Sequence, residues 1–339
     1  MFYIFLYCLL DEREIPNDYI WSMNVTDGQW QTVQGIKSHK FLVFSAYYDT
    51  RDKENPVIRV IGINPIKHSE KVKCRMYFRN ENKHEFFVDV PASISRVRDH
   101  IKDELYQDCH VLCPLKFIKS SYYEDHIPNS VSIMPLFQWS PSDAKATNKL
   151  LVVNSKNGGT GTHKVQNTDI GVCVKPIHSH YNNSLEIIEF IELNKLLGAK
   201  KFIIYNESMS EEVSCVLNYY IQKENLVRII KWDLLSKIDA SSVAIRGVLS
   251  ALNDCIYRNM NEFHYLMQID LDEFIIPRIH NTIPEMLKYL DSHKTESVKL
   301  SRDQIANLKK TAKLRKNSRK TTAYSFQNAM FYLRFGKKL

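Results

Sequence analysis

The sequence lacks several short motifs that would assign a chain of this size to a class of protein. Its seven cysteines form no C-x-x-C pair and show no zinc-ligand spacing. Three of its ten glycines lie within Asn157–Thr162, which has neither the G-x-x-x-x-G-K-[ST] nor the G-x-G-x-x-G spacing of phosphate-binding loops. These absences argue against a structural zinc site and a glycine-rich phosphate loop, and the segment is expected to be part of a linker.

No apolar run of the sequence is long enough to cross a membrane. The apolar segment Met1–Leu10 stops at Asp11, and ten helical residues rise only ~15 Å, half the hydrocarbon thickness of a bilayer. It also lacks the basic region and the small-residue cleavage site of a signal peptide. We expect this segment to be a strand or the end of an anchor whose start is not visible in this chain.

The net positive charge of the chain arises in one segment. Lys294–Lys320 holds ten Lys and Arg against two acids, a balance equal to the net charge of +8 of the whole chain. The segment has no aromatic residue interleaved with its charges, as single-stranded nucleic-acid binding would require. We therefore expect a solvated basic face, with an anionic surface or diphosphate as the alternative, and no nucleic-acid partner.

The compartment is left open by composition. Seven cysteines are compatible with secretory-pathway disulfides plus an odd thiol, and equally with reduced buried thiols. The sequons that begin at Asn24, Asn182 and Asn206 permit glycosylation, although about two arise by chance in a chain of this length. If the protein is lumenal, Cys74 and Cys113 are candidates for a disulfide.

The pattern of strands and helices changes along the chain. Before residue 138 it predicts strands alone, and after residue 170 it predicts strands that alternate with helices, which is typical of an α/β layer with a mostly parallel sheet. The expected early strands are 41–48, 57–63, 73–78, 84–90, 130–137 and 150–153, the last within the linker. The expected later strands are 172–177, 201–205, 226–232 and 264–269, and the helices are 184–198, 210–223 and 247–259.

An acidic motif ends the last of these strands. Asp270, Asp272 and Glu273 follow an apolar run directly, and crowded carboxylates repel one another unless a cation lies between them. Oxygen ligands without Cys suit Mg²⁺ or Mn²⁺, which commonly hold a diphosphate. An EF-hand is excluded because Ile275 stands where that loop needs glycine. Ligands of open α/β sheets bind beyond the carboxyl ends of the strands, which favours the metal over a solvated acidic turn.

Several separated segments, in this order, resemble glycosyltransferase family 92, a set of metazoan Golgi-type transferases. The likeness covers roughly residues 40 to 331. It is carried by Phe44–Asp49, Ile58–Gly62, Val172–Pro176, Glu189–Phe190, Leu197–Ala199, Phe202–Asn206, Tyr219–Tyr220, Leu226–Val227, Trp232, Arg246–Gly247, Ala251–Cys255 and Asp270–Ile275 with Pro277.

The resemblance implies a fold and a reaction. The fold is α/β, a GT-A (Rossmann-like, mostly parallel sheet) catalytic domain preceded by a β-rich N-terminal domain. The expected divisions are an N-terminal segment 1–39, a β-rich domain 40–137, a linker 138–169 and a catalytic domain 170–339. The implied activity is metal-dependent transfer of a hexose, galactose in the best understood members, from a UDP-sugar to a glycan or glycoprotein acceptor with inversion. The implied location is the lumen of the Golgi or secretory pathway, with a membrane anchor.

The resemblance also assigns residues. Asp270 and Asp272 match the metal-binding Asp-x-Asp, with Mn²⁺ or Mg²⁺ as the ion. Donor-binding residues are expected to be Pro176, Tyr205, Asn206, Arg246, Asp254 and Asp270.

Alternatives stay open for the roles of Asp254 and Glu273. Asp254 binds sugar hydroxyls, or it caps a helix or forms a buried salt bridge with Arg246 or Arg258. Glu273 orients the metal pair, approaches the acceptor as a weak candidate base, or is a surface carboxylate. Trp232 is expected to be a core residue.

A further metal ligand and a catalytic base are expected downstream of the acidic motif. Only His280 and His293 follow it, so we expect the base beyond Leu339 and a chain cut short at that end. The alternative function is a catalytically inactive homologue that binds a glycan or a nucleotide sugar.

Overall fold

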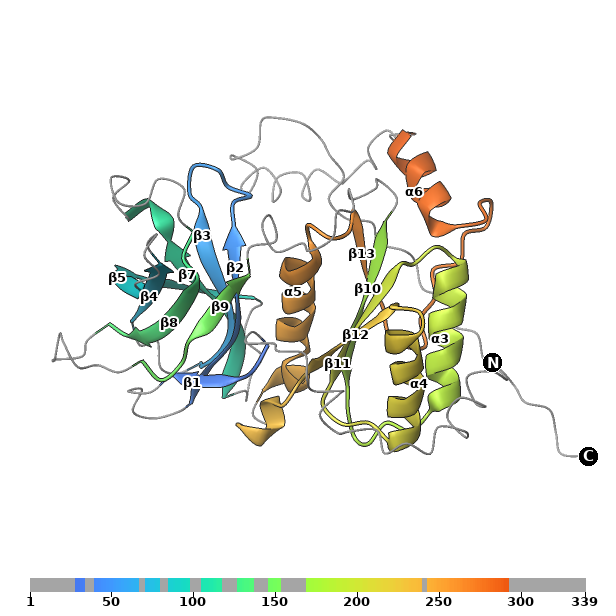
Figure 1. Cartoon of the computed structure of the whole chain (residues 1–339), viewed down its shortest axis with the longest axis horizontal. Helices are drawn as coiled ribbons and strands as arrows, with labels where there is room; N and C mark the ends of the chain where they lie inside the picture. The colour runs from blue at the N-terminus through green and yellow to red at the C-terminus, as the bar shows by residue number, and fades with distance from the viewer. Residues whose placement is uncertain are drawn as a thin grey trace, which may run out of the picture. The chain divides into compact units, whose positions relative to one another are not determined.

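The computed structural model describes residues 28–33, 40–66, 71–79, 85–97, 105–117, 127–136, 146–153, 169–239 and 243–292 (Figure 1). The chain divides into two compact units, Met1–Glu273 and Phe274–Leu339. The expectations for Met1–Leu10, Asn157–Thr162 and Lys294–Lys320 lie outside the described residues.

Nine of the described strands form one large sheet. Their order is β5-β4-β8-β9-β2-β3-β7-β6, with β1 paired to β2. Neighbours run antiparallel except β2 and β9, which are parallel. The strands are β1 Gln31–Val33, β2 Phe41–Asp49, β3 Val57–Pro65, β4 Val72–Arg79, β5 Glu85–Pro91, β6 Ser93–Arg96, β7 Tyr106–Pro114, β8 Ser130–Pro135 and β9 Leu150–Val153.

Six of these strands are those that the sequence predicted, and β1, β6 and β7 are additional. The disulfide Cys74–Cys113 joins β4 to β7, which confirms the pair of candidate cysteines.

The remaining four described strands form a parallel sheet. Its order is β12-β11-β10-β13, built from β10 Ile170–Ile177, β11 Lys201–Asn206, β12 Val227–Lys231 and β13 Tyr265–Gln268. Helices α3 Ser184–Leu196 and α4 Glu211–Gln222 pack together on one face, and α5 Val248–Asn259 lies on the other (Figure 1). The second unit contributes α6 Ile283–Ser292. The 3₁₀ turns are η1 Leu115–Phe117, η3 Leu234–Ser236 and η5 Ala244–Gly247.

Local signals placed these helices well. Ser210 caps α4, and its side chain accepts a hydrogen bond from the Val213 amide at 3.3 Å. Glu211 and Glu212 follow in the first turn, where acidic side chains stabilise the amino end of a helix. The expected helix start at 210 is therefore confirmed to within a residue.

The expected fold class is wrong. Strands hold 41% of the described residues and helices 27%, and the dominant element is a large, curled, mixed antiparallel sheet. The structure is therefore not a Rossmann-like parallel sheet preceded by a β-rich N-terminal domain. The alternation after residue 170 correctly indicated parallel pairing, but only among four strands. A local period does not report how many distant strands join a second sheet.

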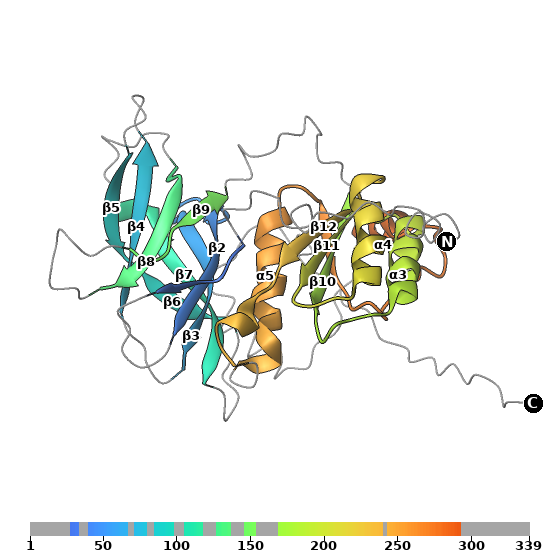
Figure 2. The same ribbon diagram turned by 60° about the horizontal axis from the view of Figure 1, so that its bottom comes forward.

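Helix α5 packs against both sheets. It contacts β10 and β13 of the parallel sheet and β2, β3 and β7 of the large one, as two views of the ribbon show (Figures 1 and 2). Its amino end follows Gly247, whose φ of 71° is left-handed and suits glycine. Trp232 is fully buried between Trp30, Phe44 and Tyr205, which confirms it as a core residue.

Candidate functional site

The carboxyl ends of the parallel strands bring separate loops to one edge of the sheet. Parallel strands end on the same side, so the loops after β10, β11 and β13 all leave the sheet there. The acidic motif follows β13, the loop 178–183 follows β10, and Asn206 ends β11. This edge is where ligands bind in open parallel sheets.

The acidic motif folds into a tight turn. The Asp270 amide donates to Glu273 Oε2 at 3.0 Å, and the Glu273 amide donates back to the Asp270 carbonyl at 3.0 Å. Asp270 is partly buried, whereas Asp272 and Glu273 are exposed. The Glu273 carboxylate thus holds the backbone of the turn.

Asp270 is also paired with a lysine of the neighbouring strand. Lys175 Nζ lies 2.5 Å from Asp270 Oδ2. Lys175 precedes Pro176, which has no amide hydrogen to donate to the ladder, and the β10–β11 register shifts between Val174 and Ile177. Such irregularities re-aim side chains beside binding sites. Pro176 itself is buried, so its role here is in the backbone.

The loop after β10 adopts a strained backbone. Ser179 and His180 both have positive φ, 60° and 50°, which is uncommon for residues with a side chain. The loop is tied to the one after β11, because the His180 amide donates to Ser208 Oγ at 3.1 Å and the Ser210 amide donates to the Tyr181 carbonyl at 2.9 Å. Strain of this kind gathers at ligand-binding sites.

Tyr181 links this loop to the acidic turn. Burial raises the pKa of Tyr181 well above its usual value, and the charges of Glu186 and Asp272 raise it further. The Tyr181 hydroxyl donates to Glu186 Oε2. Asp272 is therefore within electrostatic reach of the loop after β10.

Polar groups also meet at the end of β11. Arg246 has a left-handed φ of 53°, and its Nη1 lies 3.1 Å from Glu207 Oε1. Asn206 Oδ1 and Glu207 Oε2 are buried and have no hydrogen-bond partner among the residues that the structure describes. Glu207 thus connects two expected donor-binding residues, because it follows Asn206 in the chain and pairs with Arg246.

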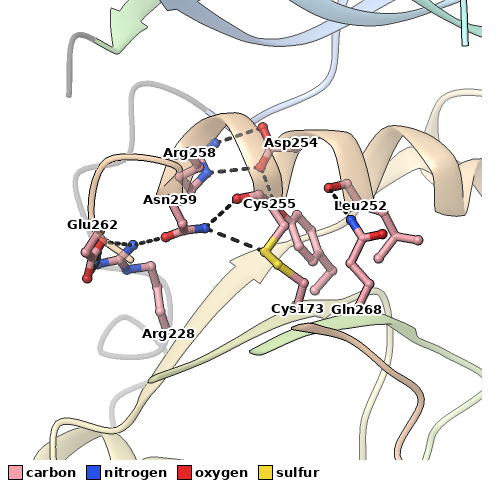
Figure 3. The surroundings of a disulfide bond; sticks show 10 residues. Cys173, Arg228, Leu252, Asp254, Cys255, Arg258, Asn259, Glu262 and Gln268 are labelled. Carbon is pink, nitrogen blue, oxygen red and sulfur yellow. Dashed lines mark hydrogen bonds and ion pairs between the residues drawn. A yellow bond between two sulfur atoms is a disulfide. The ribbon is translucent and has the colours of Figure 1, made fainter. Parts of the chain in front are cut away.

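Asp254 and Tyr205 lie inside the protein instead. Asp254 is 0% exposed, and its carboxylate accepts from Tyr205 at 2.6 Å and from Arg258 at 3.0 and 3.1 Å. Ser45 and Tyr47 of the large sheet also donate to it. This is the buried salt bridge with Arg258 that the sequence left open (Figure 3). The carboxylate also joins α5 to β2 and β11.

Comparison with known proteins identifies the region that carries this edge. The model of the family "Glycosyltransferase family 92" matches residues 168–335. This region belongs to glycosyltransferase family 92. It contains the whole parallel sheet, α5 and the acidic turn.

A curated relative gives a second, shorter match. The chain is 30% identical over 112 residues to a Caenorhabditis elegans protein named "Beta-1,4-galactosyltransferase galt-1". The match covers 32% of this chain and 26% of that protein, so the chain spans about a quarter of the relative's length. Both comparisons therefore relate this region to glycosyltransferases.

The family-92 region has features that sequence reasoning missed. Lys175 and Glu207 were not among the expected site residues, although each is a charged residue at or next to the end of a buried strand. Within the described ranges, no three His, Cys, Asp or Glu side chains converge as a group able to hold a metal. The acidic turn therefore offers one carboxylate already paired with an ammonium, and two exposed ones.

Proposed function

We propose that this protein transfers a hexose, galactose, from a UDP-sugar to a glycan acceptor, using Mn²⁺ or Mg²⁺ held by Asp270 and Asp272. The observation that supports it most is the position of the acidic turn at the carboxyl edge of the parallel sheet, within the family-92 region. The name of the relative supports galactose as the sugar.

The residues of the turn fit a divalent cation. Asp270 Oδ1 is buried and has no hydrogen-bond partner in the described part of the chain, so it can accept a further ligand. Carboxylate oxygens are the ligands that Mn²⁺ and Mg²⁺ prefer. When bound, the ion supplies Lewis-acid stabilisation of the charge that develops on the departing diphosphate.

The chain's own residues then bind and orient the donor. Asp270 and Asp272 would hold the cation. Glu273 keeps the turn in place through the Asp270 amide, and Arg246 would offer its guanidinium to phosphate oxygens. The acceptor hydroxyl attacks the anomeric carbon, the bond from that carbon to the diphosphate oxygen breaks, and the hydroxyl proton passes to a base. Attack from the face opposite the diphosphate inverts the anomeric centre.

We also place the protein in the lumen of the Golgi or secretory pathway. The disulfides Cys74–Cys113 and Cys173–Cys255 support an oxidising compartment. No helix among the described residues is long and apolar enough to span a bilayer. Attachment through a membrane anchor stays a prediction.

The test is UDP binding measured by calorimetry. We expect UDP to bind the 339-residue chain in Mn²⁺, and we expect binding to be lost in EDTA and in Asp272→Ala. Glu189→Ala removes an exposed carboxylate of α3 and should leave the affinity unchanged. Equal affinity with and without metal would contradict the proposal. Binding without transfer from UDP-galactose to glycan acceptors would instead favour an inactive, sugar-nucleotide-binding homologue.

A further inference from the structure

Lys175 is the one exposed residue of a strand that is otherwise buried. The burial pattern of β10, Ile170–Ile177, is interrupted only at this position, and the Lys175 side chain is 46% exposed. The ammonium pairs with Asp270, 95 residues later in the sequence. The pair bridges two neighbouring parallel strands at the edge described above.

The backbone aims Lys175 at the acidic turn. Register between β10 and β11 is regular up to Val174 and resumes at Ile177, so Lys175 and Pro176 occupy the irregularity. On the other side, β10 pairs with β13 only as far as Cys173 and Gln268. Lys175 therefore lies beyond the last residue of β10 that pairs with β13, beside the chain that continues into Asp270.

The Lys175 ammonium supplies positive charge at the acidic turn, as a bound metal ion would. Asp270, Asp272 and Glu273 carry three negative charges, and Lys175 offsets one of them. Lys175 takes Asp270 Oδ2, and Asp270 Oδ1 is buried without a hydrogen-bond partner in the described ranges. A divalent cation on Oδ1 would share the Asp270 carboxylate with the ammonium on Oδ2, so the two positive charges would lie close together.

We propose that Lys175 is a specificity-determining residue that holds the cation position at Asp270 until the sugar nucleotide and its metal arrive together. This inference rests on the proposed function. When the metal binds Asp270, the like charge of the ammonium is repelled, and its flexible stem lets it turn to the diphosphate oxygens. Lys175 thus disfavours metal alone and favours metal with diphosphate.

The test separates binding of the metal from binding of the nucleotide. Free Mn²⁺ is measured by electron paramagnetic resonance during titration, and UDP affinity is measured by calorimetry in saturating Mn²⁺. The variants are Lys175→Met, which keeps the length of the stem, and Lys175→Arg, which keeps the charge. Lys200→Met is the matched control, because Lys200 is an exposed lysine at the opposite end of the strands.

We expect Lys175→Met to bind Mn²⁺ without UDP about three- to fivefold more tightly than the unmodified chain, since an exposed ion pair of this kind is weak. UDP affinity in saturating Mn²⁺ should fall by a similar factor. Lys175→Arg should restore both values toward those of the unmodified chain, and Lys200→Met should change neither. Thermal melting checks that each variant is folded.

Two outcomes overturn the inference differently. If the unmodified chain binds Mn²⁺ and UDP and Lys175→Met binds Mn²⁺ no more tightly, the role of Lys175 is wrong and the proposed function stands. If neither the unmodified chain nor Lys175→Met binds UDP in Mn²⁺, both proposals are wrong.

Discussion

His110 on β7 is a buried side chain surrounded by charge. It is 8% exposed, and Arg59 Nη1 lies 3.2 Å from its Nδ1. Arg51 and Arg59 both pair with Asp49 and both lie over the Tyr257 ring, which His110 meets edge-on. Burial first, and then the charge of Arg59, lower the pKa of His110 from 6.5 to about 4. The imidazole is therefore neutral in the folded protein at neutral pH.

This lowered pKa predicts a loss of stability on acidification. The unfolded chain takes up the proton near pH 6.5 and the folded protein only near pH 4. The stability is thus fully present above pH 6.5 and is lost as pH falls toward 4. At pH 5 we expect a loss on the order of 1–2 kcal/mol from His110.

Urea unfolding of His110→Gln at pH 7 and pH 5 measures this loss. The variant should lose less stability between the two values than the unmodified chain does. His178→Gln, at an exposed histidine, should keep the full loss. Equal losses in the unmodified chain and in His110→Gln would show that another group is responsible.

Helix α5 connects the two sheets through several kinds of bond. The disulfide Cys173–Cys255 fixes it to β10 (Figure 3). Asp254 accepts hydrogen bonds from β2 and β11. At its carboxyl end, Asn259 donates to the Cys255 carbonyl at 2.7 Å and accepts from Arg228 of β12 at 2.9 Å. Each bond lies within one turn of the next, so α5 holds the parallel sheet and the large sheet in one unit.

Loss of the Cys173–Cys255 disulfide should destabilise the protein measurably. The cysteines are 82 residues apart, and removing a disulfide of a small domain typically costs about 2–5 kcal/mol. We expect denaturant titration of the double variant Cys173→Ala/Cys255→Ala to give a free energy of unfolding lower by that amount. Cys109→Ala is the control, because Cys109 is buried and free, and its loss removes no cross-link. A double variant as stable as Cys109→Ala would mean that the disulfide contributes nothing.

Two sequons begin among the described residues, at Asn182 and Asn206, and only the one at Asn182 is accessible for glycosylation. Asn182 is exposed in the loop before α3, whereas Asn206 is 6% exposed at the end of β11. A glycan on Asn206 has no space in the folded protein. The lumenal location that we propose therefore predicts a glycan at Asn182 and none at Asn206.

Secretion from eukaryotic cells tests this in a chain that carries Asn24→Gln, because that sequon lies outside the described residues. The protein should shift on a gel after glycosidase treatment, and Asn182→Gln should abolish the shift. Asn206→Gln should leave it in place. A shift that persists in Asn24→Gln/Asn182→Gln would refute the assignment.

The sequence by itself determined the local elements and one end of the site. Apolar runs and caps located β2, β3, β10 and α4, because a short apolar run bounded by turn residues and the satisfaction of helix-end amides are both local in the chain. The same local reasoning put Asp270 and Asp272 directly after a buried strand. It also indicated parallel pairing after residue 170.

Only the tertiary structure decided the fold class and the partners of the charged residues. Asp254 meets Tyr47 from 207 residues away, and Asp270 meets Lys175 from 95 residues away. Local pattern reports that a side chain is buried or exposed, but not which distant group it faces. The pairing of nine strands into one curled sheet is likewise a set of long-range contacts, so it became visible only once the chain was folded.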